Sequence, residues 1–189
     1  QADGCAGIPR VAVQGYSAYL KIADGCSAPC AFCAIPLIKG ALHSRPVDDI
    51  LSDARALAEG GIQEILLIAQ DTTAYGRDRG ERDALPALLQ ALTEAVPEVP
   101  WIRLMYAYPQ HITPRLIETM ARQPQICHYL DLPLQHAHPD TLRRMCRSDD
   151  VKSVRQLIAD LREAMPDISL RTSFIVGYPG ETETEFHAL

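Results

Sequence analysis

Three cysteines near the start of the chain have the clearest potential for chemistry. Cys26, Cys30 and Cys33 are spaced as C-x₃-C-x₂-C, and a tight loop with this spacing can bring three thiolates to one small object. Iron–sulfur clusters and zinc are the usual objects of such a set. A structural zinc site or an electron-transfer cluster needs a fourth protein ligand, and the nearest histidine, His43, lies ten residues beyond Cys33.

Three ligands without a fourth leave one metal position open, which is typical of a catalytic centre. The spacing therefore favours an iron–sulfur cluster with one open iron, and zinc is the alternative. Cys5, Cys127 and Cys146 are scattered along the chain, and free cysteines of this kind are commonly buried as small apolar residues. The count of 6 cysteines does not indicate disulfides, because a disulfide framework is typical of much shorter secreted chains.

The composition indicates one globular domain with a substantial core. Of the 189 residues, 47% are hydrophobic, and a chain of this length buries most of its apolar surface. The 18 basic and 24 acidic residues give a formal net charge of −6, so we expect no nucleic-acid partner for this chain. No segment approaches the ~20 apolar residues of a membrane span, and the first residues do not resemble a signal peptide. We expect a soluble, cytoplasmic protein without a membrane partner.

Apolar periodicity predicts strands and helices in alternation. The predicted strands cover residues 19–23, 64–70, 101–107, 128–132 and 169–176. The predicted helices cover 46–59, 84–96, 140–146 and 151–164, and two more begin near 113 and 181. Ser44 can cap the helix at 46–59, and Gly60 and Gly61 can end it. The apolar run at 64–70 is typical of a parallel strand covered on both faces.

Strands that alternate with helices form a parallel sheet with right-handed crossovers. The predicted fold class is therefore α/β, and we interpret the chain as a partial (β/α) barrel of parallel strands that ends before its last strand. Residues 1–15 are small, polar and rich in glycine, so we expect them to form a linker. Residues 16–189 then form the barrel domain.

In such a fold the segments that follow the C-terminal ends of the strands form the site. The polar and conformationally special residues of this chain collect in those segments, which are Gly25-Cys26, Gln70-Asp71, 106–109, 131–136 and 177–181. The five segments therefore predict one site at this edge of the sheet, and the cysteine loop is part of it.

A strand followed by C-x₃-C-x-[aromatic]-C is the signature of the radical S-adenosylmethionine superfamily. The segment that ends at Cys33 resembles it, with Phe32 in the aromatic position. The resemblance implies a [4Fe-4S] cluster held by Cys26, Cys30 and Cys33, with one open iron chelated by S-adenosylmethionine. It also implies reductive cleavage of S-adenosylmethionine to a 5′-deoxyadenosyl radical, and contact between the backbone at Phe32 and the adenine. No catalytic residue beyond the cluster ligands is implied.

Further segments resemble the methylthiotransferase family, whose members add a methylthio group to an unactivated C–H bond. These segments are 19–26, 35–36, 39–40, 44–46 and 177–182. Three others are similar to the branch that modifies the β-carbon of an aspartate on a small-subunit ribosomal protein. They are 70–76 (Gln-Asp-Thr-Thr-Ala-Tyr-Gly), 106–109 (Tyr-Ala-Tyr-Pro) and 134–137 (Leu-Gln-His-Ala). The branch that modifies adenosine in transfer RNA tends instead towards Gln-Asn-Val, Ser-x-His-Pro and Gln-Ser-Gly.

The ribosomal-protein branch is therefore the predicted activity, and a small-subunit ribosomal protein is the predicted partner. The acidic net charge of −6 agrees with this, because ribosomal proteins are basic. Methylthiolation of adenosine in transfer RNA is one alternative. A non-catalytic iron–sulfur or zinc module is the other.

The resemblance also implies contacts with S-adenosylmethionine. Gln70, Gln135 and Arg171 occupy strand ends where the family contacts this cofactor, and an arginine suits its carboxylate. For Arg171 the alternative is an ion pair inside the barrel, and for the two glutamines it is a hydrogen bond to loop backbone. Gly177 lets the backbone approach a ligand closely or form a turn.

Five other residues at the strand ends have simpler interpretations. His136 and His138 are interpreted as loop residues, because hydrogen abstraction by a radical needs no acid–base group. Tyr75, Tyr106 and Tyr108 either line the mouth of the substrate site or plug the end of the barrel.

Members of the methylthiotransferase family hold a second [4Fe-4S] cluster in an N-terminal domain, which delivers sulfur, and they have a further C-terminal domain. This sequence contains neither, and Cys5, Cys127 and Cys146 do not have the spacing to replace the second cysteine set. We therefore expect that the chain alone does not complete methylthiolation. The electron donor and the sulfur donor are not identified by the sequence.

Overall fold

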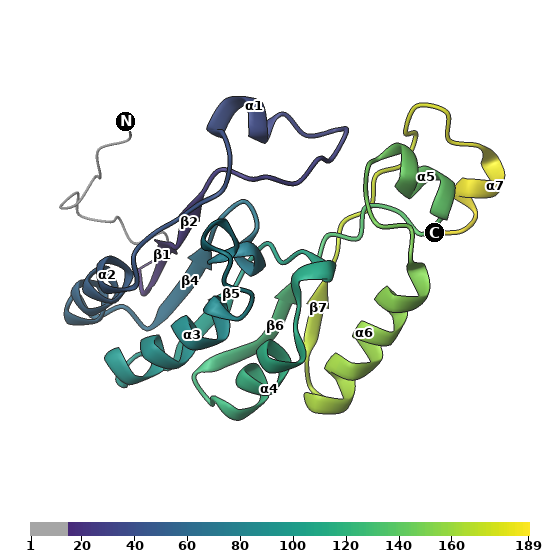
Figure 1. The fold of residues 1–189 in the computed structure, drawn as a ribbon. Helices are drawn as coiled ribbons and strands as arrows, with labels where there is room; N and C mark the ends of the chain where they lie inside the picture. The colour runs from purple at the N-terminus through teal and green to yellow at the C-terminus, as the bar shows by residue number, and fades with distance from the viewer. Residues whose placement is uncertain (1–14) are drawn as a thin grey trace.

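The computed structural model of the chain describes residues 15–189. The predicted linker at 1–15, apart from Gly15, lies outside the described residues, and so does Cys5. The described part is an α/β fold in which a parallel sheet carries its longer helices on one face (Figure 1).

Five strands form the sheet in the order β1-β4-β5-β6-β7, and each neighbouring pair is parallel. The strands are β1 (Ser17–Lys21), β4 (Glu64–Ile68), β5 (Trp101–Leu104), β6 (Ile126–Asp131) and β7 (Ser169–Arg171). The helices that connect them are α2 (Val47–Glu59), α3 (Ala84–Ala95), α4 (Pro114–Arg122) and α6 (Val151–Ala164). The predicted parallel α/β fold is confirmed, and residues 15–189 form an open sheet rather than a closed barrel.

Smaller elements gather beyond the C-terminal ends of the strands (Figure 1). They are the antiparallel pair β2 (Ala23–Asp24) and β3 (His43–Ser44), the helices α1 (Ile35–Lys39), α5 (Pro139–Arg144) and α7 (Glu183–Phe186), and the 3₁₀ turns at Thr72–Ala74, Arg77–Arg79 and Pro109–His111. Among residues 15–189, no helix combines the length and the apolar character that a membrane span needs.

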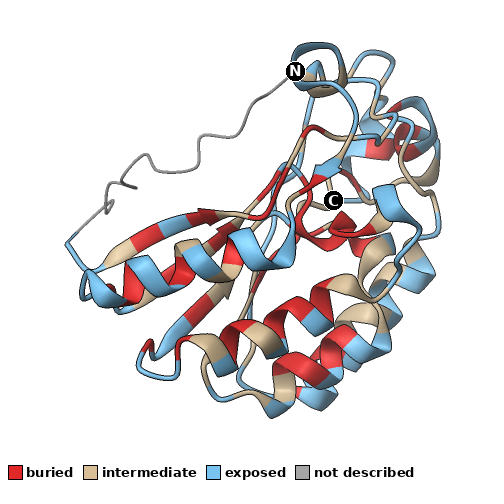
Figure 2. Ribbon diagram, turned by 60° about the vertical axis from the view of Figure 1, so that its left-hand side comes forward, coloured by how far each residue is buried: buried red, intermediate tan, exposed pale blue. Residues whose placement is uncertain are grey.

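The two faces of the sheet are buried to different extents. In β4, Ile65 and Leu67 have no exposed surface, whereas Glu64, Leu66 and Ile68 are half-buried. The prediction that this strand is covered on both faces is therefore wrong. The reason is that the connecting helices lie on one face of the sheet (Figure 2), so the side chains on the opposite face are less covered.

Polar side chains occupy part of that opposite face. The hydroxyl of Ser17 donates to Glu64 Oε2 (2.9 Å), and Glu64 Oε1 accepts from Arg103 Nε (2.7 Å). The guanidinium of Arg103 lies 4.9 Å from the centroid of the Tyr129 ring. These contacts link β1, β4, β5 and β6 across the inner face, so that the half-buried charges there are paired.

Each connecting helix turns one apolar face to the sheet (Figure 2). The buried residues recur at three- and four-residue intervals, as expected of a helix with one covered side. In α2 they are Ile50, Ala54, Leu57 and Ala58, and in α3 they include Leu85, Leu88, Leu89 and Leu92. They form one core with the buried side chains of the strands, which face the helices.

Several predicted boundaries are corrected by the structure. Ser44 does not cap α2, because its hydroxyl donates to Asp78 (2.6 Å) and accepts the N–H of Gly76 (2.9 Å). Gly60 ends α2 as predicted, and Thr113 caps α4. The strands predicted at 64–70, 101–107 and 169–176 end at residues 68, 104 and 171. They end early because the chain there leaves regular strand geometry to form the loops of the site.

An ion pair joins the two short helices at the end of the chain. Arg144 of α5 lies 2.8 Å from Glu185 Oε2, and Glu185 also forms a capping box with Thr182 at the start of α7. The hydrogen bond from Arg144, with that from the Thr182 backbone, lowers the pKa of the Glu185 carboxyl from 4.5 to about 2. The helix predicted to begin near 181 therefore begins at Glu183, after a capped turn.

We predict that Leu67→Ala destabilises the protein by about 2–5 kcal/mol, because the side chain is fully buried and its removal leaves a cavity. Leu37→Ala is the matched control, since Leu37 is 91% exposed and its removal creates no cavity. Chemical denaturation measures both variants. Equal losses of stability would contradict the assignment of Leu67 to the core.

A second prediction concerns acid. The carboxylate of Glu185 has a lowered pKa in the folded state, so its contribution to stability is present above pH 4.5 and is lost as the pH falls towards about 2. Glu185→Gln should lower the melting temperature near neutral pH and flatten its decline across this acid range. Glu183→Gln, an exposed change on the same helix, is the control. An acid profile of Glu185→Gln parallel to that of the unmodified chain would contradict the prediction.

Candidate functional site

The cysteine loop, residues 25–34, connects β2 to α1. β2 and β3 pair in antiparallel register, with Ala23 opposite Ser44 and Asp24 opposite His43, and close the base of the loop. Gly25 has φ +69°, and a Cβ at this position would lie 2.1 Å from the carbonyl oxygen of Ala41. Only glycine fits this approach, which brings the N–H of Cys26 to the carbonyl oxygen of Gly40 (3.1 Å).

The three cysteines line one cavity of about 430 Å³, which we call the cysteine cavity. Its other lining residues come from five segments of the chain: Ala28, Phe32 and Ile35 of the cysteine loop and the start of α1; Ala69, Gln70 and Asp71 after β4; Tyr106, Ala107 and Tyr108 after β5; Pro133 and Gln135 after β6; and Arg147 after α5. The structure thus brings Phe32, Gln70 and Gln135 together with the cysteines. Of the five strand-end segments predicted to form one site, only 177–181 does not line the cavity.

The donor set fits a cluster with three protein ligands. Cys26, Cys30 and Cys33 are free thiols and are accessible from the cavity. No other cysteine and no histidine of residues 15–189 lines it. Burial raises the pKa of the Cys26 thiol, and the neighbouring Asp71, Cys30 and Cys33 act in the same direction. Thiols that line one cavity become stable thiolates when they bind a cationic centre.

The wall opposite the cysteine loop is a hydrogen-bonded unit formed by the ends of β4 and β5. Asp71 is buried, and its Oδ2 lies 2.8 Å from Nδ1 of His111, while its Oδ1 accepts from the Thr73 hydroxyl (2.6 Å). The same hydroxyl accepts the N–H of Tyr108 (2.9 Å). The N–H of Thr72 donates to the carbonyl oxygen of Tyr106 (3.0 Å). The segments 70–76 and 106–109, which resembled the same family branch in sequence, therefore position each other.

Two residues that line the cavity have unusual backbone geometry. Tyr106 has φ +58° and Gln135 has φ +72°, although neither is glycine. Gln135 is held by its own backbone, whose N–H donates to Ser173 (2.9 Å) and whose carbonyl accepts from Ile175 (2.8 Å). Strained backbone that is held on both sides is typical of ligand-binding loops.

Two predicted ligand residues lie away from the cavity lining. The Arg171 side chain is 56% exposed and its Nη1 lies 3.2 Å from Asp131 Oδ2, so the ion pair that was its alternative interpretation is formed. Gly177 has φ +72° and open space where a Cβ would lie, which fits a turn. Tyr75 is buried and donates to the carbonyl oxygen of Arg45 (2.8 Å), and so belongs to the core.

Sequence reasoning missed Arg147. Its guanidinium lies 4.1 Å from the centroid of the Tyr108 ring, and its Nη1 lies 3.6 Å from Sγ of Cys30. No spacing motif marks this arginine, because it reaches the cysteine loop only through the tertiary fold.

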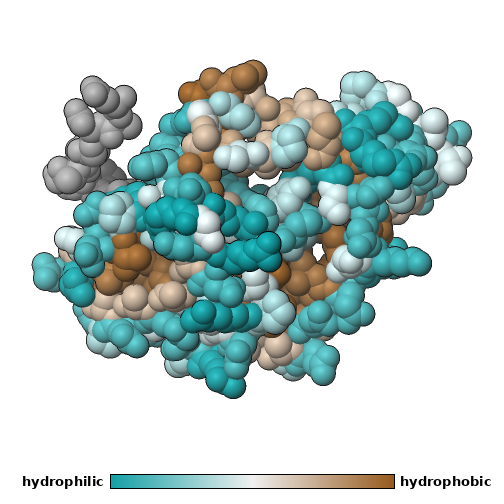
Figure 3. All heavy atoms as spheres, viewed as in Figure 1, coloured by the Kyte–Doolittle hydropathy of each residue, from teal (hydrophilic) through white to brown (hydrophobic). Residues whose placement is uncertain are grey.

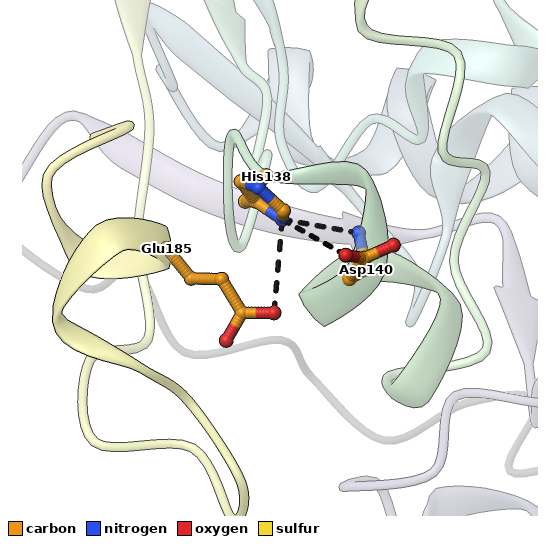
Figure 4. A group of neighbouring side chains, drawn as sticks. All are labelled: His138, Asp140 and Glu185. Atoms are coloured by element: carbon orange, nitrogen blue, oxygen red, sulfur yellow. Dashed lines mark hydrogen bonds and ion pairs between the residues drawn. The ribbon is translucent and has the colours of Figure 1, made fainter.

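A group of three possible metal ligands lies outside the cavity, where α5 and α7 meet (Figure 4). His138 Nδ1 lies 3.9 Å from Asp140 and 3.7 Å from Glu185. Each member has a structural role, since His138 accepts the N–H of Asp140 to cap α5, and the two carboxylates accept from Arg143 and Arg144. His136 accepts the N–H of His138 (2.9 Å). The interpretation of both histidines as loop residues agrees with these contacts.

The surface beside the cysteine loop is apolar. Leu37 and Ile38 of α1 are 91% and 72% exposed and form a projecting apolar patch (Figure 3). Neither residue lines the cysteine cavity, whereas Ile35, at the start of the same helix, does.

Curated relatives resemble nearly the whole chain. The ribosomal protein uS12 methylthiotransferase RimO of Herpetosiphon aurantiacus is 60% identical over 93% of this chain. The proteins of the same name from Roseiflexus sp. and Geobacter sulfurreducens are 59% and 52% identical over 95% and 92% of it. The chain spans 38–39% of the length of these relatives.

Solved structures with low sequence identity share the fold. The radical S-adenosylmethionine methyltransferase TsrM from Kitasatospora setae matches 92% of this chain and 33% of its own with a TM-score of 0.72 at 18% identity. The cobalamin-dependent S-adenosylmethionine radical enzyme OxsB matches 83% and 23% with a TM-score of 0.64 at 12% identity.

The family comparison agrees with the cysteine loop and with the fold. The model of the radical SAM superfamily matches residues 20–189, from β1 through the cysteine loop to the end of the chain. Together with the three cysteines on one cavity and the open parallel sheet, this match shows that the chain belongs to the radical SAM superfamily.

Proposed function

We propose that this chain is the catalytic core of a radical SAM methylthiotransferase that acts on the β-carbon of an aspartate on the small-subunit ribosomal protein uS12. One observation carries the proposal most directly. The cysteine triad and the segments that resemble the ribosomal-protein branch line the same cavity, and two of those segments are hydrogen-bonded to each other. Identity of about 60% to relatives named for this activity supports the same substrate.

Membership of the superfamily supports a [4Fe-4S] cluster and S-adenosylmethionine as cofactors. We propose that Cys26, Cys30 and Cys33 hold the cluster and leave one iron open. Phe32, Gln70 and Gln135 lie around the same cavity and are the proposed contacts with S-adenosylmethionine. Arg171 and Gly177 stay predictions, because they do not line the cavity.

When bound, the two cofactors supply a carbon-centred radical that abstracts hydrogen from an unactivated C–H bond. The protein positions the cofactors and keeps water from the reactive site. The interlocked segments 70–76 and 106–109 form a rigid wall opposite the cysteines, so a substrate carbon can be held in one place. The apolar side chains of Phe32 and Ile35 line the cavity beside the cysteines.

Sulfur insertion requires more than this chain holds, and we propose that a second [4Fe-4S] cluster is bound by another part of the longer protein. Cys127 lies within β6, where burial raises the pKa of its thiol, and Cys146 is exposed after α5. Neither lines the cysteine cavity. The chain alone is therefore expected to bind its cofactors without completing methylthiolation.

The acidic chain suits a basic protein substrate, and its net charge of −6 gives no support for a nucleic-acid partner. A substrate on the ribosome also places the protein in the cytoplasm, which we propose as its location.

The cofactor proposal is tested by anaerobic reconstitution with iron and sulfide. We expect about four irons per chain, and release of 5′-deoxyadenosine when S-adenosylmethionine and a reductant are added. Cys30→Ala should lower both by more than about tenfold, because a cluster held by two thiolates is not retained. Cys146→Ala, which removes an exposed thiol away from the cavity, should change neither. One tightly held zinc in place of iron would favour a structural module and refute the proposal.

The substrate is tested with the full-length protein that contains this chain. We expect methylthiolation of an aspartate in recombinant uS12, seen by mass spectrometry, and no modification of transfer RNA under the same conditions. Modification of adenosine in transfer RNA, with uS12 unchanged, would transfer the chain to the other branch. Cys30→Ala in the full-length protein serves as the inactive control for both substrates.

A further inference from the structure

Arg147 is fixed between the cysteine loop and the far wall of the cysteine cavity. Its guanidinium lies 4.1 Å from the centroid of the Tyr108 ring. Its Nη2 donates to the carbonyl oxygen of Pro133 (2.8 Å), and its Nη1 lies within hydrogen-bonding distance of Sγ of Cys30 (3.6 Å). Stacking and a carbonyl bond thus hold the plane of the guanidinium while one N–H points to the sulfur.

The backbone near Arg147 is tied to the same loop. Cys146 has φ +52°, and the N–H of Arg147 donates to the carbonyl oxygen of Leu142 (2.9 Å), which turns the chain back after α5. The carbonyl of Met145 accepts the N–H of Ala31 (3.0 Å), the residue that follows Cys30. The segment 145–147 therefore contacts the cysteine loop through both backbone and side chain, and the distance from guanidinium to sulfur is set by two independent attachments.

The positive charge of Arg147 lacks a carboxylate partner. None of the aspartates and glutamates of residues 15–189 forms an ion pair with it, although its side chain is half-buried. The two arginines just before it differ, because Arg143 pairs with Asp140 and Asp149, and Arg144 pairs with Glu185. A half-buried cation without a partner is costly, and a thiolate that ligates a cluster would supply the missing negative charge.

We propose that Arg147 is a positioning residue for the iron–sulfur cluster. Its guanidinium donates a hydrogen bond to the sulfur of the Cys30 ligand and thereby raises the reduction potential of the cluster. This inference rests on the proposed function, because it requires a cluster on Cys26, Cys30 and Cys33. Reduction adds one negative charge to the cluster. A hydrogen bond and a cation at a ligand sulfur stabilise that reduced state more than the oxidised state.

The experiment is a potentiometric titration of the reconstituted protein, followed by electron paramagnetic resonance of the reduced cluster. Arg147→Gln removes the charge, and we expect a roughly tenfold smaller equilibrium constant for one-electron reduction, which corresponds to about 59 mV towards negative potential. Arg147→Lys keeps the charge but loses the stacked, planar guanidinium. The potential of its cluster should therefore lie between those of the unmodified protein and Arg147→Gln. Arg143→Gln, four residues away and paired outside the cavity, should titrate like the unmodified protein.

A second variant keeps the inference falsifiable if Arg147→Gln takes up little iron. Tyr108→Leu leaves the arginine in place and removes the ring that holds it, and we expect a smaller shift in the same direction. Iron counts are taken for every variant, so that potentials are compared only between loaded proteins.

The outcomes separate the two proposals. If the unmodified protein binds no cluster, the proposed function fails. If it binds a cluster, and Arg147→Gln or Tyr108→Leu binds the same amount at an unchanged potential, the role of Arg147 is refuted and the proposed function stands. A negative shift in these variants, absent in Arg143→Gln, supports the role of Arg147.

Discussion

The close approach of Gly25 to the backbone of Ala41 is the contact on which the cysteine loop depends. A Cβ at Gly25 would lie 2.1 Å from the carbonyl oxygen of Ala41, so a larger residue would force the two strands of the loop apart. The short β2–β3 pairing closes the loop directly below this contact. Because Cys26 follows Gly25, the first cysteine of the triad is placed by the base of the loop, and Cys30 and Cys33 follow within the same loop.

The sheet supports this loop by presenting several rigid strand ends around it. Its helices cover one face only, so the side chains of the other face are less buried, and polar contacts such as that between Glu64 and Arg103 (2.7 Å) stabilise them there. At the C-terminal ends of the strands, the loops after β4 and β5 are joined through Thr72 and Thr73. The cavity therefore has one wall formed by a loop and the others by segments that the sheet holds in place.

The arginines of the site have different partners. Arg171 is paired with Asp131 and extends into solvent, although its position at a strand end matched a ligand contact in the related family. Arg147 comes from the turn after α5, has no carboxylate partner among the described residues, and points to a cysteine sulfur. Position along a strand does not by itself show which cation faces the cavity, because the direction of each arginine depends on its tertiary contacts.

The predictions made from the sequence succeeded where the structure depends on neighbouring residues and failed where it depends on distant ones. Local signals predicted local structure well: α6 has the predicted bounds 151–164, Gly60 ends α2, and the helix predicted to begin near 113 begins at Pro114. Ser44 failed as a cap, because its hydroxyl is engaged by Asp78 and Gly76, partners over 30 residues away. The prediction that both faces of β4 are covered was also wrong, since a run of apolar residues does not show whether helices pack against the second face.

The sequence by itself determined the cysteine triad, the alternation of strands and helices, and the polar segments at the strand ends. These depend on spacing within a few residues and on the rule that parallel strands end at one edge. Only the tertiary structure decided that Phe32, Gln70 and Gln135 share the cavity with the cysteines and that Arg171 does not. It also decided that Arg147 reaches Cys30, which is 117 residues away in sequence. Such contacts arise from the packing of α5 and its turn against the cysteine loop, and no local pattern encodes them.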